Sequence, residues 1–222
     1  DGNYSDCTII VTDNASNASN TLSVSSFVID TTAPTLSEVT AVSTPTSDTT
    51  PNYTFYSNEA GTITYGGSCS SSDTSADADN NTLTFSSMSV GSYSDCTISV
   101  SDSSSNASNT LSVSSFTIET TAPTVSSTSP TDNQSSVGVS DNISVTFSES
   151  MDNTTVTANT SNTSCSGTLQ LSSDDFSSCF QMSSSYPEST DNITFTLDPS
   201  FTMLYSTTYK IRITTSVSDI AG

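Results

Sequence analysis

The side chains that could carry chemistry in this chain are cysteines and carboxylates, because the sequence holds no histidine and only two cationic residues, Lys210 and Arg212. Without histidine no Ser–His or Cys–His pair can form, and Lys210 is the lone candidate amine nucleophile. No carboxylate pair lies in the kind of aromatic cleft context that separates two pKa values for acid–base catalysis. We therefore expect a segment that is not an enzyme.

The chain contains five cysteines: Cys7, Cys69, Cys96, Cys165 and Cys179. They lack the CxxC spacing of a zinc site, so we expect disulfides, with free buried thiols as the alternative. Cys69 follows one predicted strand and Cys96 opens another, which predicts a bridge between them. Cys165 and Cys179 are expected to form a local bridge. Cys7 is the counterpart of Cys96, and we expect its partner upstream of the given sequence.

The elements that position these residues are repeated. Residues 1–35 return at residues 90–124 with 27 of 35 positions identical, a period of 89 residues. This period exceeds the length of solenoid repeats and matches one small β-sandwich. The sequence therefore predicts tandem domains arranged like beads on a string, which supply reach and display.

Strand-like alternation is the main secondary-structure signal. The hydrophobic content of 32% and net charge of -21 approach the composition of a disordered chain. Against that, apolar residues alternate with Ser or Thr in many short runs, which is typical of half-buried strands. Such runs lie at residues 81–85, 96–100, 143–147, 154–158, 193–197 and 209–213. We expect an all-β fold of tandem Greek-key β-sandwiches with almost no helix.

The strong negative charge limits the partners. Twenty-three acidic residues oppose two basic ones, and a surface of that sign repels phosphate backbones and anionic lipid surfaces. We expect no nucleic-acid binding and no direct membrane insertion. The expected partners are neighbouring repeats of the same chain and, through self-association, other copies in a fibre.

The repeat boundaries predict three domains. Residues 1–34 form the C-terminal remnant of one repeat, residues 35–122 a complete repeat, and residues 123–222 a domain of a second type that lacks its last strand. The stretches Asp30–Pro34 and Glu119–Pro123 form short, extended linkers, because proline restricts both its own φ and the preceding residue. We expect this chain to be a segment of a longer polypeptide.

The repeated motif GxYxDCTIxVxDxxSNxSNTL resembles bacterial immunoglobulin-like repeats of very long surface adhesins and secreted proteins. Residues 123–222 resemble the S-layer-type bacterial Ig-like domain, on the strength of Pro130–Asp132, Ile143–Asp152, Leu204–Tyr209 and Asp219–Gly222. The resemblance implies tandem Ig-like sandwiches on a bacterial protein, extracellular or at the cell surface.

The same resemblance implies calcium near the linkers, since these families often bind Ca²⁺ with acidic residues between successive domains. Carboxylate, amide and carbonyl oxygens are the ligands that Ca²⁺ takes. Asp13 and Asp102 begin D-x-x-S-N turns, and we expect Asp13 to act with Asp30 and Asp102 with Glu119. Further candidates from the following loops are Glu59 and Glu149. The alternative is that these are solvated turn and capping carboxylates.

Asparagines in N-x-S/T context are candidate glycosylation sites: Asn14, Asn17, Asn106, Asn142 and Asn192. Together these features predict a structural, non-enzymatic stalk or fibre segment. One alternative is a ligand- or glycan-binding adhesin module that uses the insertion from Asn159 to Tyr186. Another is an accessory module of a secreted enzyme.

Overall fold

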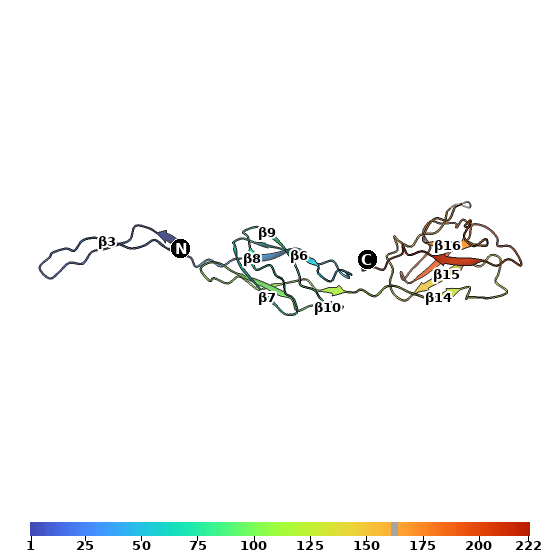
Figure 1. Ribbon diagram of the computed structural model, residues 1–222, viewed down its shortest axis with the longest axis horizontal. Helices are drawn as coiled ribbons and strands as arrows, with labels where there is room; N and C mark the ends of the chain where they lie inside the picture. Colours follow the sequence, from blue (N-terminus) through green and yellow to red (C-terminus); the bar gives the residue numbers. More distant parts are fainter. Residues whose placement is uncertain (161–163) are drawn as a thin grey trace. The chain divides into compact units, whose positions relative to one another are not determined.

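The computed structural model describes residues 1–160 and 164–222, and these residues form strands and turns without any helix (Figure 1). They make two compact units. The first comprises Asp1–Thr44 with Asp48–Thr117, and the second comprises Pro45–Ser47 with Ile118–Gly222. The predicted all-β fold is confirmed. Among the described residues, no helix is long and apolar enough to cross a membrane.

The first unit holds one β-sandwich and one β-hairpin. Its strands are β1 Gly2–Tyr4, β2 Thr8–Ile9, β3 Leu22–Ser23, β4 Phe27–Ile29, β5 Leu36–Thr40, β6 Asn52–Ser57, β7 Gly61–Gly66, β8 Ser75–Ala76, β9 Asn80–Thr84, β10 Gly91–Tyr93, β11 Thr97–Ser101, β12 Leu111–Ser112 and β13 Phe116–Ile118. The sandwich consists of the sheets β5-β6-β9 and β12-β11-β7-β8, together with the pair β10-β13.

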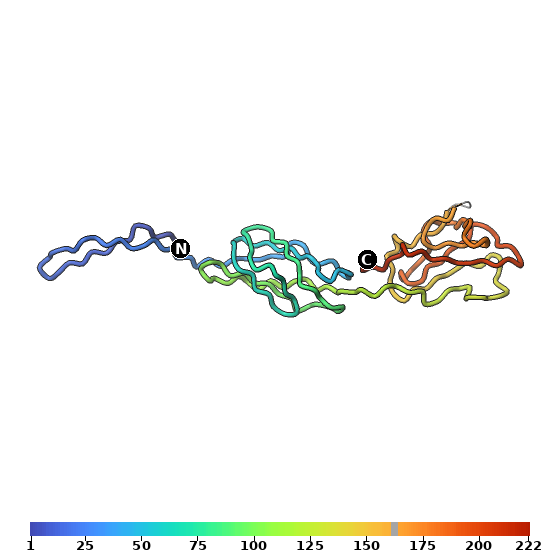
Figure 2. Tube along the Cα trace, in the orientation of Figure 1, coloured from blue at the N-terminus to red at the C-terminus, as the bar shows by residue number. Residues whose placement is uncertain are grey.

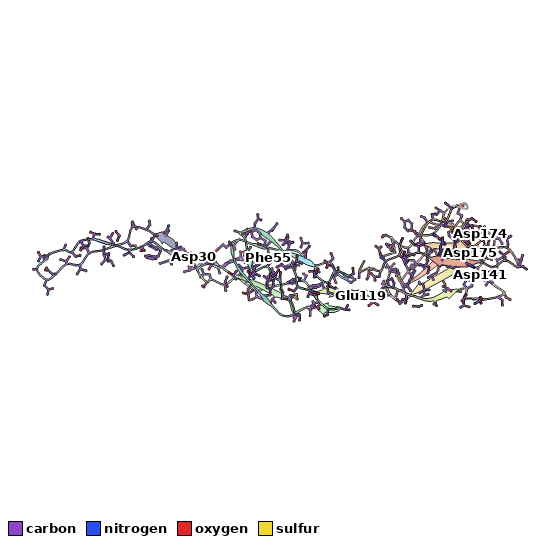
Figure 3. All side chains as sticks on the ribbon, in the orientation of Figure 1. Asp30, Phe55, Glu119, Asp141, Asp174 and Asp175 are labelled. Atoms are coloured by element: carbon purple, nitrogen blue, oxygen red, sulfur yellow. A yellow bond between two sulfur atoms is a disulfide. The ribbon has the colours of Figure 1, made fainter. Side chains whose placement is uncertain are left out.

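Period-2 alternation builds the core of this sandwich. Tyr53 and Phe55 of β6 are fully buried, whereas the neighbouring Tyr56 is 39% exposed. Phe55 is labelled in Figure 3. Ile98 and Val100 of β11 are likewise fully buried. Aromatic rings continue the core, since Phe85 stacks on Tyr53 and on Phe116 with ring centroids 5.9 and 6.1 Å apart. Such pairs stabilise beyond the area that they bury.

Residues 1–35 form a long hairpin, seen in Figure 2 as two neighbouring antiparallel runs of the blue tube. β1 pairs with β4 and β2 with β3, so that Tyr4 lies opposite Phe27 and Ile9 opposite Leu22. Residues 90–124 repeat this arrangement, because the pair Ile98 and Leu111 stands 89 residues further on. The duplicated sequence therefore encodes the same strand register twice.

The second unit is a sandwich with fewer strands among its described residues. Its strands are β14 Val125–Ser129, β15 Ile143–Phe147, β16 Leu169–Ser172, β17 Thr194–Leu197 and β18 Lys210–Ile213. They form the sheets β14-β15-β17 and β16-β18. The core contains Ile143, Val145, Phe147, Met151, Val156, Ala158, Leu169, Leu171, Met182, Phe195 and Leu197.

The predicted strand at residues 154–158 is absent from the structure. Asp152 accepts hydrogen bonds from the backbone N–H and the hydroxyl of Thr154, and its carbonyl accepts the N–H of Thr155. Aspartate favours such turns because its short side chain offers the backbone a local partner. The alternation nevertheless marks residues of the core, because Val156 and Ala158 are buried there.

Candidate functional site

Three carboxylates of the first unit converge: Asp30, Glu59 and Asp102 each offer one oxygen, and these oxygens lie within 4.8 Å of one another. Asp30 directly follows β4 and is labelled in Figure 3. Glu59 lies in the turn between β6 and β7, and Asp102 directly follows β11. Each of the three acidic residues thus lies at or near the end of a strand. We name this set the first carboxylate cluster.

A second carboxylate cluster, in the second unit, consists of Glu119, Glu149 and Asp219, again with oxygens within 4.8 Å of one another. Glu119 directly follows β13, as Asp30 follows β4. Glu149 stands two residues after β15, as Glu59 stands two residues after β6. Asp219 stands six residues after β18 and pairs with Met151 in an isolated β-bridge, whereas Asp102 directly follows β11. The two clusters therefore share two strand-end positions directly, and the third position only through the order of the strands.

The first cluster is connected to the D-x-x-S-N turn. Asp102 Oδ1 accepts the N–H groups of Ser104 and Asn106, both at 2.8 Å, and Oδ2 accepts Asn106 Nδ2 at 2.8 Å. Asn106 Nδ2 also donates to the carbonyl of Asp30 at 3.0 Å. The hydrogen bond from the Asn106 side chain is the main reason why the pKa of Asp102 lies below its usual value. This arrangement fixes Asp102 as a carboxylate next to Asp30.

The second cluster places like charges together. Burial raises the pKa of Glu149, and the neighbouring carboxylates of Glu119 and Asp219 raise it further. Hydrogen bonds from Thr121 instead lower the pKa of Glu119. Asp219 is 8% exposed, and its Oδ1 accepts the N–H groups of Ala221 and Gly222 at 2.7 and 2.9 Å. The cluster thus carries negative charge that its own hydrogen bonds only partly compensate.

Both cationic residues of the sequence contact residues outside the two clusters. Lys210 Nζ lies 2.7 Å from Asp175 Oδ1, and both side chains are exposed. Arg212 donates to Gln170 Oε1, with Nε at 2.8 Å, and its guanidinium lies 4.1 Å from the ring centroid of Phe176. Among the described residues, no cationic side chain is paired with a carboxylate of either cluster.

The structure groups the predicted acidic residues differently from the expected pairs. Asp13 belongs to neither cluster among the described residues; its carboxylate accepts the N–H groups of Ala15 and Asn17 in its own turn. Asp102 lies with Asp30 and Glu59, and Glu119 lies with Glu149 and Asp219. The sequence reasoning missed Asp219. The signal was the stretch from Asp219 to Gly222, which resembles the turn that Asp102 begins.

The two disulfides join the cysteine pairs expected from the sequence. Cys69 bridges to Cys96 with a Cα–Cα distance of 5.2 Å, and Cys165 bridges to Cys179 at 4.8 Å. Cys7 is a free, half-buried cysteine in the structure. An upstream partner for Cys7 stays a prediction.

The candidate glycosylation sites differ in accessibility. Asn14, Asn17 and Asn142 are exposed, whereas Asn106 and Asn192 are half-buried. Asn106 Nδ2 makes two hydrogen bonds, and attachment of a sugar would leave it one N–H. The exposed asparagines are therefore the better acceptors.

The insertion expected to serve a ligand-binding role uses its polar groups internally. Asn159 is fully buried, and its side-chain amide donates to the carbonyls of Cys179 and Phe180 at 3.2 and 2.9 Å. Its Oδ1 accepts the N–H of Ser166 at 2.9 Å. Residues 161–163 of the insertion lie outside the described residues. These contacts connect the two ends of the insertion to each other.

Comparison with known proteins agrees with this architecture. Residues 119–222, just under half of the chain, match the family model of a bacterial Ig-like domain. No curated protein and no solved structure matches the chain. The family match supports a bacterial Ig-like domain over this range, and domains of this kind are generally structural modules without enzymatic activity.

Proposed function

We propose that this chain is a structural, non-enzymatic segment of an extracellular bacterial repeat protein, serving as part of a stalk or fibre. The observation that carries the proposal is the near-identity of residues 1–35 and 90–124 in both sequence and strand register. A recognition site needs residues that differ from those of neighbouring domains, and a near-copy offers few. The two disulfides suit an oxidising location outside the cytoplasm.

The spacer role is tested by length. Deleting one 89-residue period from the full-length protein should shorten its stalk by one sandwich, about 35 to 45 Å for strands of some 10 to 12 residues at about 3.3 Å each. Electron microscopy of the intact assembly measures this. Export and ligand binding should persist. Loss of a specific interaction, with export and neighbouring domains intact, would replace the spacer assignment by an adhesive one.

Calcium at the two carboxylate clusters belongs to the same proposal. Ca²⁺ binds oxygens at about 2.4 Å, so two ligands on opposite sides of one ion lie about 4.8 Å apart. The cluster oxygens lie within 4.8 Å of one another, so one ion could contact all three carboxylates. When bound, the ion would compensate the crowded negative charge and link the residue that follows β4 or β13 to two loops of the adjoining sandwich. Backbone carbonyls and water would complete the coordination.

Calorimetric titration of the calcium-stripped chain tests this assignment. Extracellular calcium modules bind at about 0.1 to 1 mM, so the titration runs into the millimolar range. Glu59→Gln should remove the first site and Glu149→Gln the second. Glu188→Gln, an exposed glutamate of the second unit outside both clusters, is the matched control and should retain both. Absence of any binding to the unmodified chain would reject calcium.

Thermal unfolding adds an independent readout. In chelator, Glu149→Gln should raise the Tm of the second unit because it removes one of three crowded charges. With calcium in excess the unmodified chain should have the higher Tm of the two, because it gains the binding free energy of the ion. The same order under both conditions would show that these carboxylates repel one another without holding a cation.

A further inference from the structure

The sequence contains a single Asp–Pro peptide bond, which joins Asp198 to Pro199 directly after β17. An aspartate carboxyl can attack the carbonyl carbon of its own residue, because this closes a five-membered cyclic anhydride. The step requires the next residue to leave as an amine. Proline is the best leaving group for it, because its nitrogen belongs to a tertiary amide and takes up a proton more readily than an ordinary peptide nitrogen.

The backbone on both sides of this bond is held in place by the chain segment at residues 181–188. Met182 forms an isolated antiparallel β-bridge with Pro199, and Glu188 forms one with Thr196. Met182 and Leu197 are 1% and 3% exposed, so each anchors its own segment in the core. The Asp–Pro bond is therefore fixed relative to the residue that follows Met182. Groups held in a fixed geometry react faster than groups that must first find each other.

That residue, Ser183, contacts the groups that would react. Its N–H donates to the main-chain carbonyl oxygen of Asp198 at 2.8 Å. Its Oγ lies 3.0 Å from the same oxygen and 2.8 Å from Asp198 Oδ2. Two donors on a carbonyl oxygen stabilise the negative charge that develops there when the carbon is attacked. The shared hydroxyl also keeps the carboxyl group beside its own carbonyl, and no other described residue donates to Oδ1 of Asp198.

We propose that this chain cleaves itself at the Asp198–Pro199 bond and that Ser183 promotes the reaction in the folded domain. Oδ1 of the neutral Asp198 carboxyl forms a bond to the carbonyl carbon of the same residue. The bond from that carbon to the nitrogen of Pro199 breaks, and the carboxyl proton passes to this nitrogen. Water then adds across the anhydride and restores two carboxyl groups. One water molecule is consumed, and the products end at Asp198 and begin at Pro199.

The surroundings of the bond admit the water that the second step needs. Ser183 and Asp198 are exposed, and they line a cavity of about 140 Å³, which has ample room for a water molecule. The other titratable side chains among the described residues of this lining are Tyr186 and Glu188, and none of the lining residues is cationic. Because the leaving nitrogen must receive a proton, cleavage should accelerate as the pH falls toward about 4, where carboxyl groups take up protons.

Cleavage would leave the second unit without covalent continuity. Both disulfides lie before Asp198, so neither of them spans the bond. β18 would then be held only by its packing and by its pairing with β16. In a stalk under tension, acid would thus convert a covalent link into a non-covalent one. This consequence rests on the proposed function, whereas the cleavage itself does not.

The experiment uses the full 222-residue chain in mildly acidic buffers in which circular dichroism shows the native fold. Mass spectrometry after denaturation should detect two fragments, residues 1–198 and residues 199–222. The folded chain should be cleaved roughly tenfold or more faster than the chain unfolded in guanidinium chloride at the same pH, because the Ser183 donors act only in the fold. A buried oxyanion donor supplies about a hundredfold or more, and this site is exposed. Absence of the fragments from the folded chain, or equal rates in both states, overturns the proposal.

Substitutions at the site separate its parts. Asp198→Asn removes the attacking carboxyl and should stop the cleavage. Ser183→Ala removes the hydroxyl but keeps the N–H, and should slow the folded chain by roughly tenfold, below the loss of a buried oxyanion donor. Ser183→Thr keeps the hydroxyl and should retain most of the rate. A rate for folded Ser183→Ala equal to that of the unmodified chain overturns the role of Ser183.

The neighbouring serine provides the matched control. The hydroxyl of Ser184 accepts the N–H of Tyr186 at 3.2 Å, so Ser184→Ala should leave the cleavage rate unchanged. In guanidinium chloride the unmodified chain, Ser183→Ala and Ser184→Ala should all be cleaved at the same slow rate. A difference that persists between them in denaturant would show that the effect comes from local sequence and would overturn the proposal.

Discussion

The hairpin at residues 1–35 and its copy at residues 90–124 share their strand pairing and differ in burial. Tyr4 stacks on Phe27 with centroids 5.2 Å apart, and Tyr93 stacks on Phe116 at 5.3 Å. Yet Phe27 is 44% exposed and Phe116 2%. The difference shows that the hairpin's register is encoded locally, whereas its burial requires the strands β5 to β9 that cover only the second copy.

The sharpest way to break this comparison is to truncate the same ring in both copies. Phe116→Ala should lower the free energy of unfolding of the first sandwich by about 3 to 5 kcal/mol, because it leaves a cavity in a packed core. Phe27→Ala should change it by at most about 0.5 kcal/mol, since that ring lies outside the sandwich core. Urea unfolding measures both. Equal losses would show that the first hairpin is packed in solution as its copy is.

The cysteines give the next largest difference. Cys96→Ser removes the bridge to Cys69 and should destabilise the sandwich by about 2 to 4 kcal/mol. Cys7→Ser, the same substitution in the other copy, should leave the unfolding curve unchanged because Cys7 has no disulfide partner here. Non-reducing peptide mapping confirms the pairing. A loss from Cys7→Ser as large as that from Cys96→Ser would contradict the assignment.

The smallest expected effect concerns the D-x-x-S-N turn, which both copies contain. Side-chain hydrogen bonds, from Asn17 to Asp13 and from Asn106 to Asp102, are the main causes that lower the pKa of each aspartate. Each therefore contributes stability that is present above the usual aspartate pKa and is lost as the pH falls through the lowered value. NMR titration of the two carboxyl carbons should give similarly lowered values. A normal value for Asp13 alone would mean that its turn needs the sandwich.

Sequence reasoning identified the features that are encoded within one strand or one repeat. Alternation identified β9, β11 and β15, and the repeat offset related Cys7 to Cys96. The resemblance to bacterial Ig-like repeats selected Asp30 at the linker and Glu59 in the following loop. Sequence reasoning failed at residues 154–158, where the Asp152 turn outweighs the alternation.

The sequence reasoning missed Asp219 for a different reason. Asp102 directly follows β11, but Asp219 stands six residues after β18, so a fixed repeat offset cannot relate them. Their equivalence lies in the order of strands, which the differing sequence of the second unit conceals.

The disulfide between Cys69 and Cys96 also sets how far the first sandwich can be stretched. Under tension applied at the two ends of the chain, an unfolding domain lengthens by the contour of every residue that it releases. The bridge spans 27 residues, so roughly 90 Å of extended chain stays locked in a closed loop. The bridge across 14 residues in the second unit withholds roughly 45 Å more. Each disulfide thus makes the length that its domain releases on unfolding shorter than the number of residues suggests.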